Sequence, residues 1–140
     1  MGTKETAEEP TAETTGLRTI RIIAGDVEAI AHLNESQSAA AIWDALPIEA
    51  RGSRWGEEIY FSIPLDLAPE DPQEVVDSGD LAYWPPGNAF CIFFGRTPAS
   101  VGDEVRPASP VNVVGRVQGA PTIFKRVRDG ARVVIDRESA

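Results

Sequence analysis

Two adjacent glutamates are the side chains in this sequence best placed to do chemistry. The alternating pattern of residues 58–63 predicts a strand that begins at Glu58, and Glu57 directly precedes it. The two carboxylates should therefore point to opposite faces. A carboxyl enclosed by apolar groups has a raised pKa and can accept a hydrogen bond or act as a general acid or base. Because Glu58 shares a face with Tyr60 and lies opposite Ile59, we favour an outward Glu58 that keeps the sheet soluble. An acid–base or binding role at the mouth of a barrel is the alternative.

The other reactive side chains are one histidine and one cysteine. His32, beside Leu33 on an expected strand, is interpreted as an ordinary strand side chain near a barrel end, and any Ser-His-Asp arrangement would have to use it. Cys91, between Phe90 and Ile92 with no neighbouring base, is interpreted as an unreactive core thiol. A zinc site needs several imidazole or thiolate ligands, which one His and one Cys cannot supply. We expect no metal and no cofactor.

Hydrophobic periodicity predicts the elements that position these residues. Residues 18–24 and 27–33 alternate as two strands around Gly25, which predicts a hairpin. Ser36 is a suitable N-cap for a helix of about ten residues that ends before Pro47. The apolar residues of that helix recur at helical spacing: Ala39, Ile42, Trp43 and Leu46.

After the helix the pattern changes to short strands separated by glycine and proline, which is typical of a mainly β barrel or sandwich. The predicted strands are 54–55, 58–63, 81–84, 89–94, 111–117 and 132–136. Strand 89–94 is apolar on both faces, so it should lie in the centre of its sheet. Residues 95–110 are polar and rich in Pro and Gly, which predicts a surface loop beside a binding groove.

Composition limits the class of partner. The chain has 140 residues, enough for one domain, and a net charge of −9; residues 55–95 contain eight acidic residues and no Lys or Arg. This charge argues against nucleic acid as a partner. One cysteine cannot form an internal disulfide, and no cationic start precedes an apolar run, so we expect a soluble, cytoplasmic protein without a membrane partner. Residues 1–16 are predicted to be a disordered leader. The oligomeric state is left open.

Aromatic side chains are concentrated in the acidic segment. Eight of the ten lie between Trp55 and Phe94. Tyr83 and Trp84 point to opposite faces of one strand, so one of them must leave the core. Two positions for Trp84 remain open: it is an outward platform for a ligand, or the loop 64–78 covers it.

Three blocks of the sequence resemble, in order and spacing, a bacterial and archaeal cyclophilin-like family of small barrels. The family pairs a WG-E-IYF block with later GD-AYW and FFG blocks. The corresponding blocks here are Trp55-Gly-Glu-Glu-Ile-Tyr-Phe61, Gly79-Asp-Leu-Ala-Tyr-Trp84 and Phe93-Phe94-Gly95. The resemblance extends from about residue 17 to residue 136. It implies that residues 17–140 form one closed β-barrel domain, which includes the one clear amphipathic helix.

A second, more distant resemblance is to the true cyclophilins, which are peptidyl-prolyl isomerases. Val111-Asn-Val-Val-Gly-Arg-Val117 is similar to their HVVFGRV segment, and Phe93-Phe94-Gly95 to part of their FFI-T segment. Their glutamine before the Phe-Phe pair falls on Ile92, their histidine falls on or near Val111, and their FHR block has no counterpart. The resemblance therefore implies a barrel that lacks the catalytic residues of the isomerases.

Three functions remain open. We prefer a non-catalytic binding module for a peptide or a small apolar ligand. The first alternative is a weak peptidyl-prolyl isomerase that uses Arg96 or Arg106 as its cation. The second is a small-molecule enzyme or hydrolase subunit with Glu58 as the acid or base, because the same barrel occurs in subunits of allophanate- and oxoproline-processing hydrolases. The residues expected to line the ligand groove are Glu58, Tyr60, Phe61, Tyr83, Trp84, Ile92, Phe94 and Val111.

Overall fold

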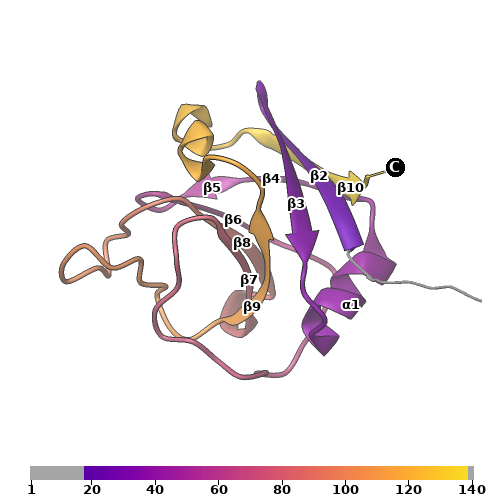
Figure 1. The fold of residues 1–140 in the computed structure, drawn as a ribbon, viewed down its shortest axis with the longest axis horizontal. Coiled ribbons are helices and arrows are strands. Elements are labelled where there is room, and N and C mark those ends of the chain that lie inside the picture. Colours follow the sequence, from indigo (N-terminus) through magenta and orange to yellow (C-terminus); the bar gives the residue numbers. More distant parts are fainter. Residues whose placement is uncertain (1–17, 139–140) are drawn as a thin grey trace, which may run out of the picture.

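The structure, a computed structural model, describes residues 18–138, which form one antiparallel sheet of nine strands (Figure 1). In their order of pairing the strands are β4 (Ile48–Arg51), β10 (Arg132–Arg137), β2 (Arg18–Ala24), β3 (Val27–Leu33), β9 (Asn112–Val117), β7 (Asp80–Trp84), β8 (Ala89–Phe93), β6 (Glu58–Ser62) and β5 (Ser53–Arg54). Gly52 alone separates the two edge strands, β4 and β5, in the sequence. The chain therefore joins the edges, and the sheet forms a nearly closed barrel. The predicted mainly β barrel is confirmed; the leader predicted at 1–16 lies outside the described residues.

The N-terminal hairpin and the helix follow the sequence prediction. Strands β2 and β3 pair along their whole length, and Gly25 between them has a φ of 57°, a left-handed conformation that glycine adopts without steric cost. The helix α1 (Gln37–Ala45) begins after Ser36, whose hydroxyl accepts a hydrogen bond from the backbone N–H of Ala39 at 3.1 Å. The predicted turn at Gly25 and the predicted helix start at Ser36 are thus confirmed, because each rests on a local steric or hydrogen-bonding preference.

Strand β4 and several element ends were not predicted from the sequence. Ile48 is the one buried residue of β4, so the strand has almost no alternating pattern of its own and forms by pairing with β10. Strand β5 begins one residue earlier than predicted, and β8 ends at Phe93. Val111 lies outside β9 and forms an isolated bridge with Gln73. Two 3₁₀ turns were not predicted: η2 (Pro85–Gly87) and η3 (Pro121–Arg126).

Strand β8 is buried on both faces. Phe90 and Ile92 point into the barrel interior, which holds the main core, while Ala89, Cys91 and Phe93 belong to a second apolar cluster on the outer face. The strand pairs with β6 on one side and β7 on the other, so its predicted central position is confirmed. A sheet that is apolar on both faces needs a cover over the outer face as well as a filled interior.

Two long connections provide that cover. Val76, between β6 and β7, and Val105, between β8 and β9, form an isolated bridge, and both side chains are buried in the outer cluster. The second bridge, from Gln73 to Val111, ties the connection between β6 and β7 to the start of β9. These connections run along the left and lower sides of the barrel in Figure 1. The loop predicted at 95–110 is therefore present, but the bridges hold it against the sheet.

A buried amide joins the helix, the connection between β6 and β7, and β9. Asn112 is 1% exposed; its Nδ2 donates to the hydroxyl of Ser38 at 3.0 Å and to the carbonyl of Ala68 at 2.9 Å. Its Oδ1 accepts from the backbone N–H of Glu70 at 2.8 Å. The carboxylate of Glu70 in turn accepts from the hydroxyl of Ser38 and from the backbone N–H groups of Gln37 and Ser38 at the start of α1, and these hydrogen bonds lower the pKa of Glu70. This network is fully satisfied and fixes one end of the connection that covers the sheet.

The junction between β3 and β9 can be tested at Gly115. These strands share three paired residues, and a Cβ on Gly115 would lie 2.4 Å from the carbonyl oxygen of His32 and 3.0 Å from Cα of Leu33. Because backbone atoms cannot yield, we expect Gly115→Ala to lower the free energy of unfolding by about 1–3 kcal/mol in urea denaturation. The matched control is Gly102→Ala, whose Cβ would lie 3.5 Å from Glu104 Oε1, an ordinary contact. Equal unfolding midpoints for the two variants would contradict the tight junction.

Candidate functional site

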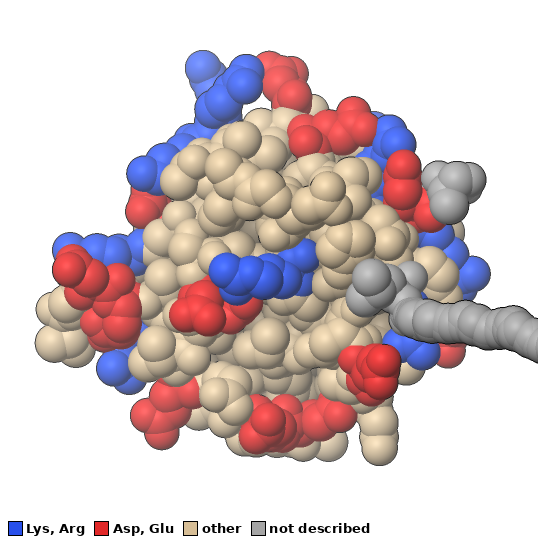
Figure 2. All heavy atoms as spheres, viewed as in Figure 1, with Lys and Arg blue, Asp and Glu red and all other residues tan. Residues whose placement is uncertain are grey.

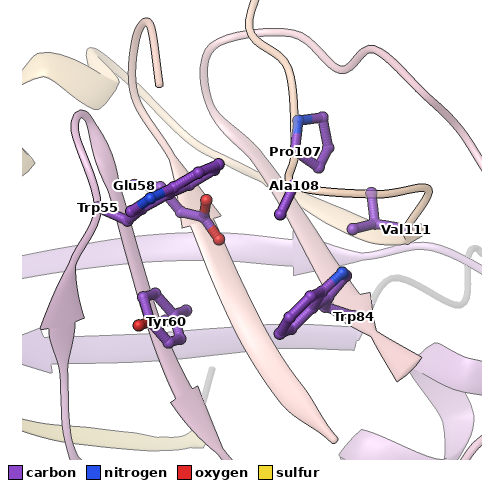
Figure 3. A pocket seen from close by; sticks show the side chains of 7 residues that line it. All are labelled: Trp55, Glu58, Tyr60, Trp84, Pro107, Ala108 and Val111. Atoms are coloured by element: carbon purple, nitrogen blue, oxygen red, sulfur yellow. The ribbon is translucent and has the colours of Figure 1, made fainter. Parts of the chain in front are cut away.

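A pocket of about 230 Å³ opens on the outer face of the sheet, beside the loop that connects β8 and β9. We call it the outer-face pocket; it is lined by Trp55, Glu58, Tyr60, Trp84, Pro107, Ala108 and Val111. Figure 3 shows the carboxylate of Glu58 among the other side chains, with the rings of Trp55, Tyr60 and Trp84 around it. The lining is therefore apolar and aromatic except for one carboxyl group and one phenol hydroxyl.

Glu58 is buried without a full set of partners. The residue is 5% exposed, and its Oε1 is a buried atom with no hydrogen-bond partner. Burial raises the pKa of Glu58 from an ordinary value of 4.5 to about 7, and the neighbouring thiol of Cys91 opposes this rise only in part. The favoured sequence interpretation, a solvated Glu58 that keeps the sheet soluble, is wrong.

The alternation that placed Glu58 on the outer face is nevertheless confirmed. Glu58 and Tyr60 share the outer face, while Ile59 packs in the interior. Glu57 lies elsewhere, and its carboxylate is 3.4 Å from Nζ of Lys125. The error was to equate the outer face with solvent: the covering loop brings Pro107 over this part of the sheet, and Pro107 is itself buried.

Trp84 stands on the outer face and Tyr83 in the interior. The indole Nε1–H of Trp84 donates to the hydroxyl of Ser109 at 2.7 Å, so the connection between β8 and β9 holds this ring. The hydroxyl of Tyr83 donates to the carbonyl of Leu65 at 2.7 Å and accepts from the backbone N–H of Leu67 at 3.1 Å. The connection at 64–78 therefore binds Tyr83, and Trp84 is left half-buried at the pocket, as the platform interpretation requires.

The structure brings half of the predicted groove residues together. Those that line the outer-face pocket are Glu58, Tyr60, Trp84 and Val111. The others lie buried in the barrel interior: Phe61, Tyr83, Ile92 and Phe94. Strand alternation separates the two sets, because neighbouring residues of one strand face opposite sides. Sequence reasoning missed Trp55, Pro107 and Ala108, which come from irregular segments; only the aromatic block at Trp55 offered a signal for one of them.

The arginines predicted as catalytic candidates, Arg96 and Arg106, do not line the outer-face pocket. Arg96 is exposed, and Nε of Arg106 lies 2.9 Å from the carboxylate of Glu104. The guanidinium nearest Phe94 belongs instead to Arg54, 5.0 Å from the ring centroid, where Nη1 donates to a backbone carbonyl at 2.7 Å. Among the described residues, no Lys or Arg lines the pocket.

The other reactive groups have ordinary structural surroundings. His32 bonds through its ring nitrogens to the hydroxyl of Thr19 and the side-chain carbonyl of Gln118, as expected for a strand side chain. Cys91 is fully buried, and burial raises the pKa of its thiol. Within residues 18–138, no three His, Cys, Asp or Glu side chains gather as metal ligands. No helix in this part of the chain is long and apolar enough to cross a membrane.

A larger cavity, about 510 Å³, lies between the segment that precedes α1, strand β9 and the connection from β6 to β7. Two of its four carboxylates have protein partners: Glu70 binds the start of α1, and Asp80 binds the backbone N–H of Asp77 at 2.8 Å and Arg116 at 2.9 Å. The other two, Asp71 and Asp77, are exposed to solvent. The outer-face pocket differs because its ionisable side chain is buried and has an unpartnered atom. We therefore take the outer-face pocket as the candidate functional site.

Comparisons with known proteins agree with the barrel. Residues 18–136 match the protein-family model described as Cyclophilin-like. The solution structure of the hypothetical protein AF2241 from Archaeoglobus fulgidus is similar, with a TM-score of 0.76 and 40% sequence identity over 91% of this chain and 100% of that chain. No curated protein matches the sequence. The similarity thus extends over almost the whole barrel.

The pKa of Glu58 predicts how stability depends on pH. A carboxyl whose pKa is higher in the folded than in the unfolded chain binds more protons when folded, so the contribution of Glu58 to the free energy of unfolding falls as the pH rises from about 4.5 to about 7. The cost is on the order of 3 kcal/mol, since a tenfold change in acidity corresponds to about 1.4 kcal/mol. Glu58→Gln should abolish this fall, and its stability relative to the natural protein should rise between pH 5 and pH 8.

Urea denaturation at several pH values tests this expectation, and the difference between the two proteins cancels the titration of the other carboxyls. Glu57→Gln, the same change at the neighbouring residue, is the control and should keep the pH dependence of the natural protein. If the free energies of unfolding of Glu58→Gln and of the natural protein changed in parallel with pH, the ionisation of Glu58 would not destabilise the fold, and the expectation would be wrong.

Proposed function

The chain belongs to the cyclophilin-like family, and we propose that it is a non-catalytic binding module that holds a small, largely apolar ligand in the outer-face pocket. The observation that carries this proposal is the buried carboxyl of Glu58 with its unpartnered Oε1. Burying a polar atom without a partner costs free energy, and the fold receives no hydrogen bond in return. A ligand that supplies the missing donor would explain why the group is there.

The aromatic lining supports the same conclusion. Trp55, Tyr60 and Trp84 are half-buried, so each keeps part of its ring accessible from the pocket. Aromatic rings contribute large apolar contact areas at small entropic cost, and a few polar groups fix the orientation of a ligand. The volume of about 230 Å³ lies below the range typical of drug-sized ligands, which favours a small molecule or a single side chain of a peptide.

A second candidate is an enzyme that uses Glu58 as a general acid or base. It is favoured by the pKa of about 7, because a catalytic carboxyl works best when its pKa is near the operating pH. The lining offers Tyr60 as the other group with an ionisable proton. Binding without reaction requires only the apolar rings and the carboxyl group that line the pocket, so a binding module remains the preferred function.

A thermal-shift screen of fragments and short peptides tests the binding module. We expect at least one compound to raise the melting temperature, since a ligand at a hundred times its Kd adds about 2.7 kcal/mol of stability. The effect should be lost in Glu58→Gln and in Trp84→Ala and kept in the control Glu57→Gln. NMR spectra of each hit after incubation should show the compound unchanged.

Three results of that screen would contradict the proposal. If no compound stabilises the natural protein, or if the hits stabilise Glu58→Gln equally, the outer-face pocket is not the binding site. If a hit is converted and Glu58→Gln abolishes the conversion, the enzyme replaces the binding module.

The isomerase alternative has a direct assay. Rotation about the X-Pro bond has a barrier near 20 kcal/mol, and the pocket has no cation among its described lining residues to stabilise the twisted amide. Arg106 would first have to leave Glu104. We therefore expect no acceleration in a protease-coupled proline assay. An acceleration that disappears in Arg106→Ala or Arg96→Ala would establish the isomerase instead.

A further inference from the structure

The chemistry of the lining narrows the ligand of the outer-face pocket, an inference that rests on the proposed function. We propose that the ligand is an organic cation with an alkylated ammonium group, held by the carboxylate of Glu58 and the rings of Trp55, Tyr60 and Trp84. Three observations carry the inference: the charge of the site, the nature of its surfaces, and the small number of hydrogen-bond acceptors in it.

The electrostatic surroundings of the pocket select a cation. Glu58 is the one acid among the described lining residues, and an ionised carboxylate is an acceptor only, so the group it needs is a donor or a positive charge. An opposite charge within a few ångströms stabilises the ionised carboxylate, which offsets the cost of burying it. Arg106, the cationic residue next to lining residue Pro107, already pairs with Glu104.

The wider charge distribution agrees with a cationic ligand. Residues 55–95, which supply four of the seven lining residues, contain eight acidic residues and no Lys or Arg. On the face shown in Figure 2, acidic side chains gather along the lower edge, where Figure 1 shows the connection between β6 and β7. Such a field attracts cations to the protein and repels anions.

The rings provide surfaces that bind cations. The face of an aromatic ring carries negative electrostatic potential, and tryptophan binds a cation more strongly than tyrosine or phenylalanine. In Figure 3 the rings of Trp55 and Trp84 stand on either side of the carboxylate of Glu58, with Tyr60 below. The hydrogen bond from Trp84 to Ser109 holds one of these rings in place before a ligand arrives.

The scarcity of acceptors indicates which kind of cation fits. A primary ammonium has three N–H donors and a guanidinium has five, and each buried donor needs an acceptor. The lining side chains offer three acceptor atoms, the two carboxylate oxygens of Glu58 and the hydroxyl of Tyr60, while the rest of the surface is apolar. A guanidinium has more donors than this, and a primary ammonium would need all three acceptors to converge on it. An alkylated ammonium carries its charge on methyl or methylene groups, which need no acceptor and pack against rings. A bare metal ion would lack ligands here.

Choline and its neutral isostere, 3,3-dimethylbutan-1-ol, test the inference because they have the same shape and differ in charge. Their affinities are measured by NMR, from the indole N–H signals of Trp55 and Trp84, at pH 8 and pH 5.5. At pH 8 we expect choline to bind at least about tenfold more tightly than the alcohol, the size of effect expected for a desolvated cation–π site. At pH 5.5 choline should bind about thirtyfold more weakly, because Glu58 is then protonated, while the alcohol should be unaffected.

Variants separate the carboxylate from the rest of the pocket. Glu58→Gln should reduce the preference for choline at pH 8 to the part that the rings supply and leave the weak binding of the alcohol, whereas the control Glu57→Gln should keep the full preference. A peptide amide of Nε-trimethyllysine, measured beside choline, distinguishes the two sources of such a group: the tighter binder shows whether the natural ligand is a side chain or a free small molecule.

The outcomes distinguish this inference from the function on which it rests. Equal binding of choline and the alcohol at both pH values would overturn the cation and leave the binding module intact. The cation would also be overturned, and the binding module kept, if choline did not bind while a neutral compound from the thermal-shift screen bound in a way that depends on Glu58. If neither probe nor any library compound perturbs the indole signals, both the inference and the binding module fail.

Discussion

The burial of β8 on both faces is the constraint from which the rest of the structure follows. Its inward residues fill the barrel, and its outward residues Ala89, Cys91 and Phe93 form a second apolar cluster that water cannot cover favourably. The connections from β6 to β7 and from β8 to β9 must therefore lie over the sheet, and paired backbone groups at Val76 and Val105 keep them there. The outer-face pocket lies at one side of this cover, beside Pro107 and Ala108.

Two buried polar side chains under this cover contrast sharply. Asn112 makes hydrogen bonds with both ends of its amide, to α1 and to the covering connection, so its burial contributes to the fold. Glu58 is about as deeply buried, yet its Oε1 has no partner and its pKa is raised to about 7. A carboxyl that costs stability and joins no elements is better explained by a ligand than by folding.

The family of the barrel does not by itself identify the function of the outer-face pocket. The barrel is that of the cyclophilin-like family. The resemblance to the isomerases was expected from short sequence segments alone. Of the positions that correspond to isomerase residues, Ile92 lies in the interior, and the arginine that lies over the ring of Phe94 is Arg54, which is bound to backbone carbonyls. Function in this chain therefore has to be argued from the outer-face pocket itself.

The sequence by itself determined the features that depend on neighbouring residues. The hairpin turn at Gly25, the cap at Ser36, the alternation of β6 and the central position of β8 follow from backbone sterics and side-chain period, and the three aromatic blocks carried the family. Even the face of Glu58 was predicted correctly. These features could be predicted because each is decided within a few residues along the chain.

Only the tertiary structure decided what covers each face. Strand β4 exists because β10 pairs with it, and Glu58 is buried because a loop more than 45 residues later in the sequence places Pro107 above the sheet. The same packing put Tyr83 and Phe94 in the interior and left Trp84 at the pocket. The alternation of residues along a strand predicts which side chains share a face. The exposure of that face depends on long-range contacts with irregular segments, and these segments have no hydrophobic periodicity from which their position could be predicted.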